Sequence, residues 1–296
     1  MKRVSVARMW LYGLVAVLAL AGCEAKPPPA AERLSGSVVS ADGVPIKYEV
    51  SGAGEPALVF VHCWTCNRQF WDEQVSYFER YYRVVRLDLA GHGESGKGRK
   101  NYTMAAFGAD VAAVAEQLGL KQVVLVGHSM GGPVSAEAEK RLGKSRVLGV
   151  VGVDTFHTGF PLPKNDKEVA AFVKPFEDDF RGYGEKFMRG MFTPQSDPAL
   201  INRIGGMVLG SDKTMAVSAL KNILAWYRND AASSFDRLGE RLRNINADPL
   251  NQGRPLHRSV VLVGGVGHFV AQEKPAEFNR ALQAVVTQLV NGTSYR

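Results

Sequence analysis

The sequence predicts an α/β protein: a mostly parallel, doubly wound sheet with a helical block inserted after its sixth strand. Short continuous apolar segments, typical of strands buried on both faces, alternate with longer helical segments, and that order is typical of a parallel sheet. The alternation stops near residue 155 and resumes near residue 238. We therefore assign residues 35–154 and 238–296 to one core and residues 155–237 to a helical cap.

The first residues indicate export. Three basic residues precede an apolar run over residues 9–21, which is too short to span a bilayer comfortably and fits a signal sequence. The run ends in Leu20-Ala21-Gly22-Cys23, which resembles a bacterial lipobox, where the cysteine is lipidated and becomes the mature N-terminus. We assign residues 1–22 to a lipoprotein signal peptide and the proline-containing residues 23–34 to an extended tether.

The residue after Cys23 is Glu24 rather than aspartate. By resemblance to Gram-negative lipoproteins, this favours sorting to the outer membrane, so we expect a lipid-anchored protein of the bacterial cell envelope that faces the periplasm. The formal charge of +7 falls to +4 when the three basic residues of the signal are removed, and the remaining charges are dispersed. We therefore expect membrane contact through the anchor and no nucleic-acid partner.

The core elements follow an opening hairpin around Asp42-Gly43. Apolar runs indicate strands, and segments with helical periodicity between them indicate helices. The predicted strands are residues 38–40, 46–50, 57–61, 82–89, 123–126, 147–153 and 260–263, and the predicted helices are residues 70–78, 104–118, 131–142 and a last one ending near residue 289.

The apolar run 123–126 leads into Gly127-His128-Ser129-Met130-Gly131. A buried strand, Gly-x-Ser-x-Gly and a helix-compatible segment together predict a nucleophile elbow. The two glycines bracket a tight turn, so the Ser129 hydroxyl would stand at its tip, facing the amide-rich start of the next helix, where negative charge is stabilised. The alternative is a glycine-rich turn without chemistry.

The cap, residues 155–237, is helical and rich in aromatic residues. Because it lies between two core strands, it should cover the strand ends that carry Ser129. Some of its aromatic side chains could line an apolar pocket, while most should form the cap's own core.

Cys63 and Cys66 are the only cysteines besides Cys23. Their Cys-x-x-Cys spacing suits a redox pair or half a metal site, but no second pair exists to complete a zinc site. Export would place them in an oxidising compartment, where they can form a local disulfide. The alternative is two small, partly buried residues at a strand end, and we expect no metal.

Four segments carry motifs in a fixed order: His62-Cys63-Trp64 after a strand, residues 88–95, residues 127–131, and Gly267-His268-Phe269 with Glu273-x-Pro275 and Phe278. Together they resemble the α/β-hydrolase family over most of residues 36–290, apart from the cap. The resemblance implies the α/β-hydrolase fold, a serine–acid–histidine triad and an oxyanion hole. Ser129 and His268 match the triad directly, and the oxyanion amides would be those of Trp64 and Met130.

The chemistry of these residues agrees with the resemblance. A serine hydroxyl needs a base to remove its proton, the imidazole needs a carboxylate to fix its tautomer, and two amides must meet the oxyanion. Among the six histidines, only His268 lies in a loop between a terminal strand and the last helix. Structural roles are favoured for His62, His92 and His128, which belong to turn motifs.

Two aspartates compete for the acid of the triad. Family acids usually follow the penultimate strand, where Asp248 stands, but the strand before it is short and polar. In other members of the family the acid follows the strand before the cap, and here Asp154 ends an unambiguous apolar strand at that place. We favour Asp154, because a carboxylate held by a rigid buried strand orients an imidazole better, and we keep Asp248 as the alternative.

One position departs from the family pattern, because Cys63 stands where the family usually has glycine. A Cβ atom there can distort or narrow the oxyanion hole.

Serine at the elbow argues against haloalkane dehalogenases and epoxide hydrolases, which use aspartate. We expect a monomeric serine hydrolase that cleaves an ester or related acyl bond of a small apolar substrate through an acyl-enzyme, without a cofactor. The alternatives are an acyltransferase and a non-catalytic lipoprotein that binds or scaffolds.

The lipobox generates the first prediction. Cys23→Ser removes the thiol that would carry the lipid, so the variant should stall in processing or leave the membrane fraction. Fractionation of cells with an antibody against the protein measures this outcome. If wild type and variant were both soluble periplasmic proteins, Cys23 would not be an anchor.

Overall fold

The computed structural model describes residues 33–159, 162–249 and 254–292. The proposed signal peptide, Cys23 and all but two residues of the tether lie outside this part. Within it, no helix is both long and apolar enough to cross a membrane. The strands are β1 (Leu34–Val39), β2 (Pro45–Ser51), β3 (Ala57–Val61), β4 (Val84–Leu87), β5 (Val123–His128), β6 (Val147–Val153), β7 (Leu242–Asp248) and β8 (Val260–Gly264).

These strands form one eight-stranded sheet in the order β1-β2-β4-β3-β5-β6-β7-β8. The pairs β1–β2 and β2–β4 are antiparallel, and every other neighbouring pair is parallel. Helices cover both faces of the central strands, so β3 and β5 are wholly buried, and β6 is buried except at Leu148; their sequences are therefore continuous apolar runs. The predicted mostly parallel, doubly wound sheet is confirmed.

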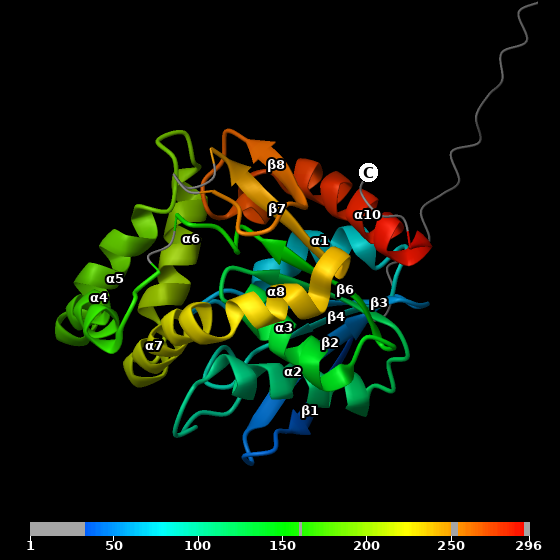
Figure 1. The fold of residues 1–296 in the computed structure, drawn as a ribbon, viewed down its shortest axis with the longest axis horizontal. Coiled ribbons are helices and arrows are strands. Elements are labelled where there is room, and N and C mark those ends of the chain that lie inside the picture. The colour runs from blue at the N-terminus through cyan, green and yellow to red at the C-terminus, as the bar shows by residue number, and fades with distance from the viewer. Residues whose placement is uncertain (1–32, 160–161, 250–253, 293–296) are drawn as a thin grey trace, which may run out of the picture.

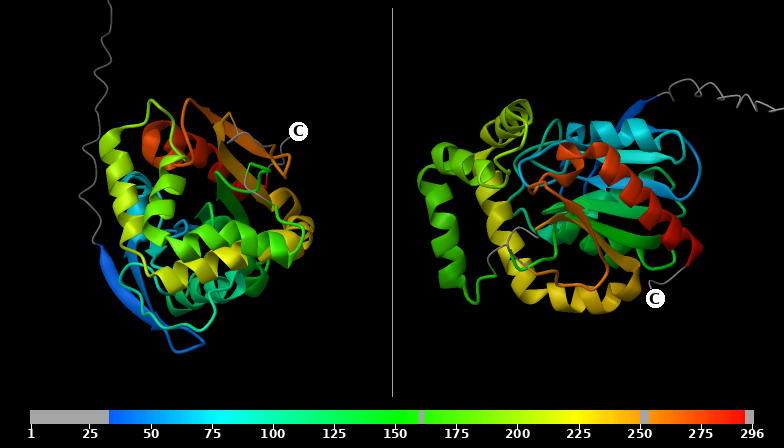
Figure 2. Two further views of the ribbon diagram at one scale, coloured as in Figure 1. Left: turned by 90° about the vertical axis from the view of Figure 1, so that its left-hand side faces the viewer. Right: turned by 90° about the horizontal axis from the view of Figure 1, so that it is seen from above.

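Helices flank the sheet in two layers, as Figures 1 and 2 show: α2, α3 and α8 on one side, α1 and α10 on the other. Close approach of α2 and α3 depends on Gly108, where a Cβ atom would lie 2.6 Å from the Cβ of Glu137. The helices on the sheet are α1 (Asp72–Phe78), preceded by the 3₁₀ turn η1 (Arg68–Trp71), α2 (Met104–Gln117), α3 (Gly131–Leu142), α8 (Ala231–Leu238), followed by η2 (Gly239–Arg241), α9 (Val270–Glu273) and α10 (Pro275–Asn291).

The inserted segment after β6 forms four helices at one end of the sheet, α4 (Asp166–Asp178), α5 (Phe180–Arg189), α6 (Pro198–Leu209) and α7 (Lys213–Asn229) (Figure 2). We call these four helices and their connections the cap. The fifth helix, α8, instead packs on α3, where Arg237 forms an ion pair of 2.9 Å with Glu139. The chain has therefore returned to the core before β7 begins.

Strand β7 differs from its appearance in the sequence. The segment before Asp248 looks short and polar, yet it forms a seven-residue strand between β6 and β8. Its polar side chains are buried at Arg243, Asn244 and Asn246, whereas Asp248 at its end is exposed. Asn246 donates from Nδ2 to the carbonyl of Thr155 at 3.2 Å, so the turn after β6 supplies a partner for this buried amide.

A glycine at the start of α3 generates the second prediction. In Gly131→Ala the new Cβ would lie 2.4 Å from the carbonyl oxygen of Val61, which belongs to the neighbouring strand. The free energy of unfolding should fall by about 1–3 kcal/mol, as measured by urea denaturation. The control is Gly206→Ala in α6, whose Cβ would meet nothing within 4 Å and should stabilise by up to about 1 kcal/mol. Equal stability of both variants would contradict the tight elbow.

Candidate active site

Ser129 occupies the sharp turn between β5 and α3. Its φ of 54° is left-handed, a conformation that costs a residue with a side chain about 1–3 kcal/mol. The surrounding backbone holds it: Ser129 N donates to the carbonyl of Val153 at 2.9 Å. Gly127 has no room for a side chain, since its Cβ would lie 2.0 Å from the carbonyl oxygen of Gly131. The turn has the strained geometry of a nucleophile elbow.

His268 follows β8 and is held from three directions. Its Nδ1 lies 2.6 Å from Oδ2 of Asp154, its backbone N–H donates to the carbonyl of Met191 at 2.8 Å, and its carbonyl oxygen lies 2.8 Å from Nε2 of His128. Because Nδ1 is engaged by a carboxylate, Nε2 is the nitrogen available as a base. His268 and Ser129 line the same cavity.

Asp154 lies just beyond β6, in a turn with a φ of 42°. Its Oδ1 accepts the N–H of Ala247 in β7 at 2.9 Å, while Oδ2 faces His268 and lies 3.8 Å from Nε2 of His157. Burial opposes ionisation of this carboxyl, but its interactions with His157 and His268 outweigh burial and hold its pKa well below the usual range. Asp154 is therefore a carboxylate at neutral pH, as an acceptor for the Nδ1–H of His268 must be.

Asp248, the alternative acid, stands at the end of β7 and is exposed. The Nδ1 that it would have to reach is already 2.6 Å from Asp154, which is 1% exposed. The geometry thus favours Asp154, although Asp248 stands in the position after the penultimate strand.

Trp64 and Met130, the residues expected to supply the oxyanion amides, line the same cavity as Ser129. Cys63 and Cys66 form a disulfide that brackets Trp64. The left-handed residue of this loop is Thr65, with a φ of 62°, whereas Cys63 is not among the residues with positive φ. Replacement of the family's glycine by Cys63 therefore requires no left-handed backbone at that position.

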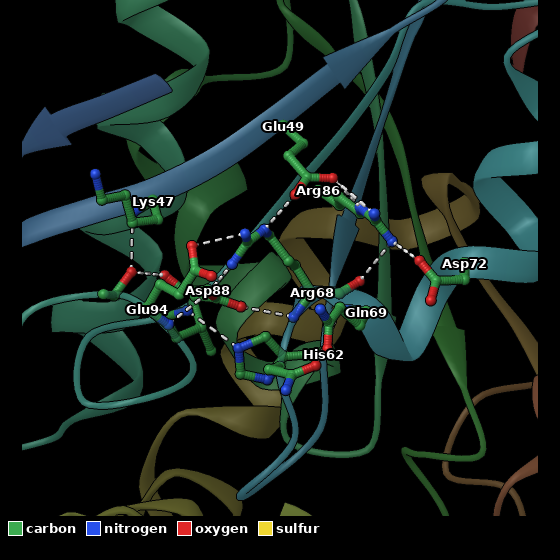
Figure 3. Close-up of polar contacts among 12 residues, drawn as sticks. Lys47, Glu49, His62, Arg68, Gln69, Asp72, Arg86, Asp88 and Glu94 are labelled. Carbon is green, nitrogen blue, oxygen red and sulfur yellow. Dashed lines mark hydrogen bonds and ion pairs between the residues drawn. The ribbon is translucent and has the colours of Figure 1, made fainter. Parts of the chain in front are cut away.

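A buried ionic network anchors the loop that carries Trp64 (Figure 3). Arg68 pairs through its guanidinium with Asp88 beyond β4 and, at 2.8 Å each, with Glu49 on β2 and with Glu94. Glu49 also pairs with Arg86 on β4 at 2.6 Å. The network also includes backbone groups, because the N–H groups of Arg68 and Glu94 both donate to the Asp88 carboxylate. Each of the loops after β3 and β4 therefore holds the other in place.

The three turn histidines are fully buried and neutral. Burial lowers the pKa of His62 to about 4 and those of His92 and His128 to about 3. As neutral rings, His62 and His92 accept backbone N–H groups: Leu89 N donates to His62 Nε2 at 3.0 Å, and Thr65 N donates to His92 Nε2 at 3.3 Å. His128 instead donates from Nε2 to the carbonyl of His268 at 2.8 Å. The three histidines therefore have structural roles, in which their rings hydrogen-bond to the backbone of neighbouring loops.

The cavity above Ser129 has a volume of about 420 Å³ and lies between the cap and the strand ends. Most of its cap residues are apolar, and the polar groups gather near Asp154. Within the described ranges, no cluster of His, Cys, Asp and Glu side chains could hold a metal ion. The cap residues on its wall include Phe187, Met191, Phe192, Leu220, Ile223 and Tyr227.

Three residues of the site have no assigned role in the sequence interpretation. His157 lines the cavity beside Asp154, and its place three residues after that acid is the one sequence signal for it. The Tyr227 hydroxyl lies 2.8 Å from Thr155 Oγ1, a contact that no local pattern indicates. Glu273 belongs to the Glu273-x-Pro275 motif, and its carboxylate accepts from Gly267 N at 2.8 Å and Ser196 Oγ at 2.5 Å. It therefore ties the His268 loop to the cap.

Residues 56–290 match the model of the alpha/beta hydrolase fold family, and the chain belongs to that family. It is 40% identical over 115 residues to a non-heme haloperoxidase of Rhodococcus erythropolis, covering 38% of this chain and 42% of that protein. It is also 40% identical over 99 residues to a bifunctional esterase/perhydrolase of Acinetobacter calcoaceticus, covering 33% and 36%. The chain thus spans less than half of the length of these two relatives.

Among solved structures, an esterase from Exiguobacterium antarcticum superposes with a TM-score of 0.72 over 86% of this chain and 100% of that chain. Sequence identity is 20%. A likeness at this level of identity shows that the two chains share a fold.

The two aspartates generate the third prediction. Asp154→Asn should lower turnover of p-nitrophenyl acetate by about 10⁴-fold, because the amide no longer fixes the tautomer and charge that His268 needs. Asp248→Asn is the matched control and should lose far less. Urea denaturation of both variants checks that folding is intact, and the reverse ranking would move the acid to Asp248.

Proposed function

We propose that this protein is a serine hydrolase that cleaves an ester or related acyl bond of a small apolar substrate through an acyl-enzyme. The observation that carries the proposal is the 2.6 Å contact between Asp154 Oδ2 and His268 Nδ1 at a cavity that also contains Ser129. Such a contact commits the histidine to one tautomer and leaves its second nitrogen for proton transfer at the serine.

The mechanism has two half-reactions. Ser129 Oγ attacks the acyl carbon while His268 Nε2 takes its proton, and the amides of Trp64 and Met130 stabilise the oxyanion. The imidazolium then returns the proton to the leaving oxygen, and the alcohol departs. In the second half, His268 removes a proton from water, the hydroxide attacks the acyl carbon, and the acid is released as Ser129 regains its proton.

The shape of the cavity supports a small apolar substrate. A volume of about 420 Å³ suits a compact organic molecule, and the cap presents aromatic and aliphatic side chains to it. Charged residues are confined to the triad region, so a strongly ionic substrate would lose hydration without gaining partners.

A second candidate reaction is perhydrolysis, in which hydrogen peroxide replaces water in the second half-reaction and a peracid is released. It is supported by the names of the curated relatives, which include haloperoxidases and the bifunctional esterase/perhydrolase. The acyl-enzyme is the same in both cases, so the acyl acceptor decides which product forms.

We further propose that the enzyme acts as a monomer in the cell envelope, held at the outer membrane by lipidated Cys23. The lipobox and Glu24 support this location. The tether would place the core beside the membrane while the cap and cavity remain free to meet substrate.

The fourth prediction tests the proposed function. A fluorophosphonate probe should label wild type at Ser129 but not Ser129→Ala, because the probe traps an activated serine. Ser129→Ala and His268→Ala should each abolish turnover of p-nitrophenyl acetate, and the double variant should be little worse than either, since the triad acts as a unit. Adding peroxide and assaying peracid separates hydrolysis from perhydrolysis. Unchanged turnover in Ser129→Ala would favour a binding module instead.

A further inference from the structure

A second, much smaller chamber opens beside Ser129, separate from the main cavity. Its volume is about 30 Å³, and Ser129, Trp64 and His268 line both spaces. The far wall combines the disulfide with apolar side chains of the cap and with one core residue from the loop after β8. Its members include Cys63, Cys66, Met188, Ile204, Val208 and Phe269.

The far wall of this chamber is closed to solvent. Cys63 and Cys66 are 3% and 2% exposed, and Ile204 and Val208 on α6 are 0% and 4% exposed. None of these side chains carries a charge, so the chamber is an apolar dead end that begins at the nucleophile.

The two spaces differ greatly in capacity. A cavity needs about 10–15 Å³ to hold one water-sized group, so a chamber of 30 Å³ accepts about two or three such groups. The main cavity is about 420 Å³. A substrate whose reacting carbon lies at Ser129 can therefore extend into the small chamber on one side and into the much larger main cavity on the other.

We propose that the small chamber is the acyl subsite and that it restricts the enzyme to short apolar acyl groups, of about acetyl to butyryl length, on larger alcohols or phenols. This assignment rests on the proposed function. The acyl group stays bonded to Ser129 while the alcohol must leave, so a closed chamber suits the group that stays and the larger cavity suits the one that departs.

The Cys63–Cys66 disulfide has two roles in this assignment. It forms part of the wall that limits the chain length of the acyl group. It also brackets Trp64, the expected oxyanion donor, so that the length limit and the oxyanion hole belong to the same short loop. Both specificity and rate would then depend on one covalent link.

The fifth prediction uses p-nitrophenyl esters of increasing acyl length. Wild type should cleave the acetate and butyrate with kcat/KM at least about 10-fold above the octanoate, since misfit of a methylene costs about 10-fold or more. Ile204→Ala and Val208→Ala enlarge the chamber and should each lower the acetate-to-octanoate ratio about 10-fold. The double variant Cys63→Ala/Cys66→Ala should lower this ratio too, and its rate on every ester should also fall.

The control is Ile223→Ala, which, like Ile204→Ala, removes three carbon atoms, but from the wall of the main cavity. This variant should leave the acetate-to-octanoate ratio unchanged and should instead raise kcat/KM for acetate esters of bulkier alcohols. Fluorophosphonate labelling of each variant shows that the site is folded.

Two results would overturn the acyl subsite while leaving the hydrolase intact. One is equal cleavage of acetate and octanoate by wild type, in a preparation of which a separate sample reacts with the fluorophosphonate probe. The other is a changed acyl-length ratio in Ile223→Ala without a change in Ile204→Ala and Val208→Ala, which would place the acyl group in the main cavity. Failure of wild type to label or to cleave any ester would instead refute the proposed function, and the acyl subsite with it.

Discussion

The candidate active site depends on the hydrogen bond between Asp154 and His268, which joins two loops that are separated by a whole strand. Asp154 follows β6, His268 follows β8, and β7 lies between these two strands. The other oxygen of Asp154 accepts the N–H of Ala247 in that intervening strand. The carboxylate is therefore fixed by the sheet itself, and the position of the imidazole depends on the parallel register of three strands.

The cap takes part in the geometry of the site as well as covering it. Trp64 donates from its indole nitrogen to the carbonyl of Ala216 in α7, and its ring meets Phe176, Phe180 and Phe187 edge-on. On the opposite side, the Met191 carbonyl accepts the N–H of His268. Both the loop that carries Trp64 and the loop that carries His268 are thus held by cap residues, so a displaced cap would disturb the candidate site as well as the pocket.

Much of the fold was predictable because its signals are local. Buried parallel strands appear as apolar runs, and the tight turn at Ser129 appears as Gly-x-Ser-x-Gly, since each depends on residues adjacent in the chain. The mostly parallel sheet and the insertion after β6 are confirmed on that basis. Strand β7 was harder to predict from the sequence, because its polar residue Asn246 finds its partner in the carbonyl of Thr155, a residue far away in the sequence.

The sequence by itself determined the family, the order of the core elements, and the candidate nucleophile and base at Ser129 and His268. Only the tertiary structure decided between the two aspartates, because both follow strands and the difference lies in which carboxylate reaches Nδ1 of His268. Tertiary packing also placed the cysteine pair at the wall of a chamber lined by α6. These contacts join segments that are distant along the chain, and side-chain packing in three dimensions, which local patterns do not encode, selects them.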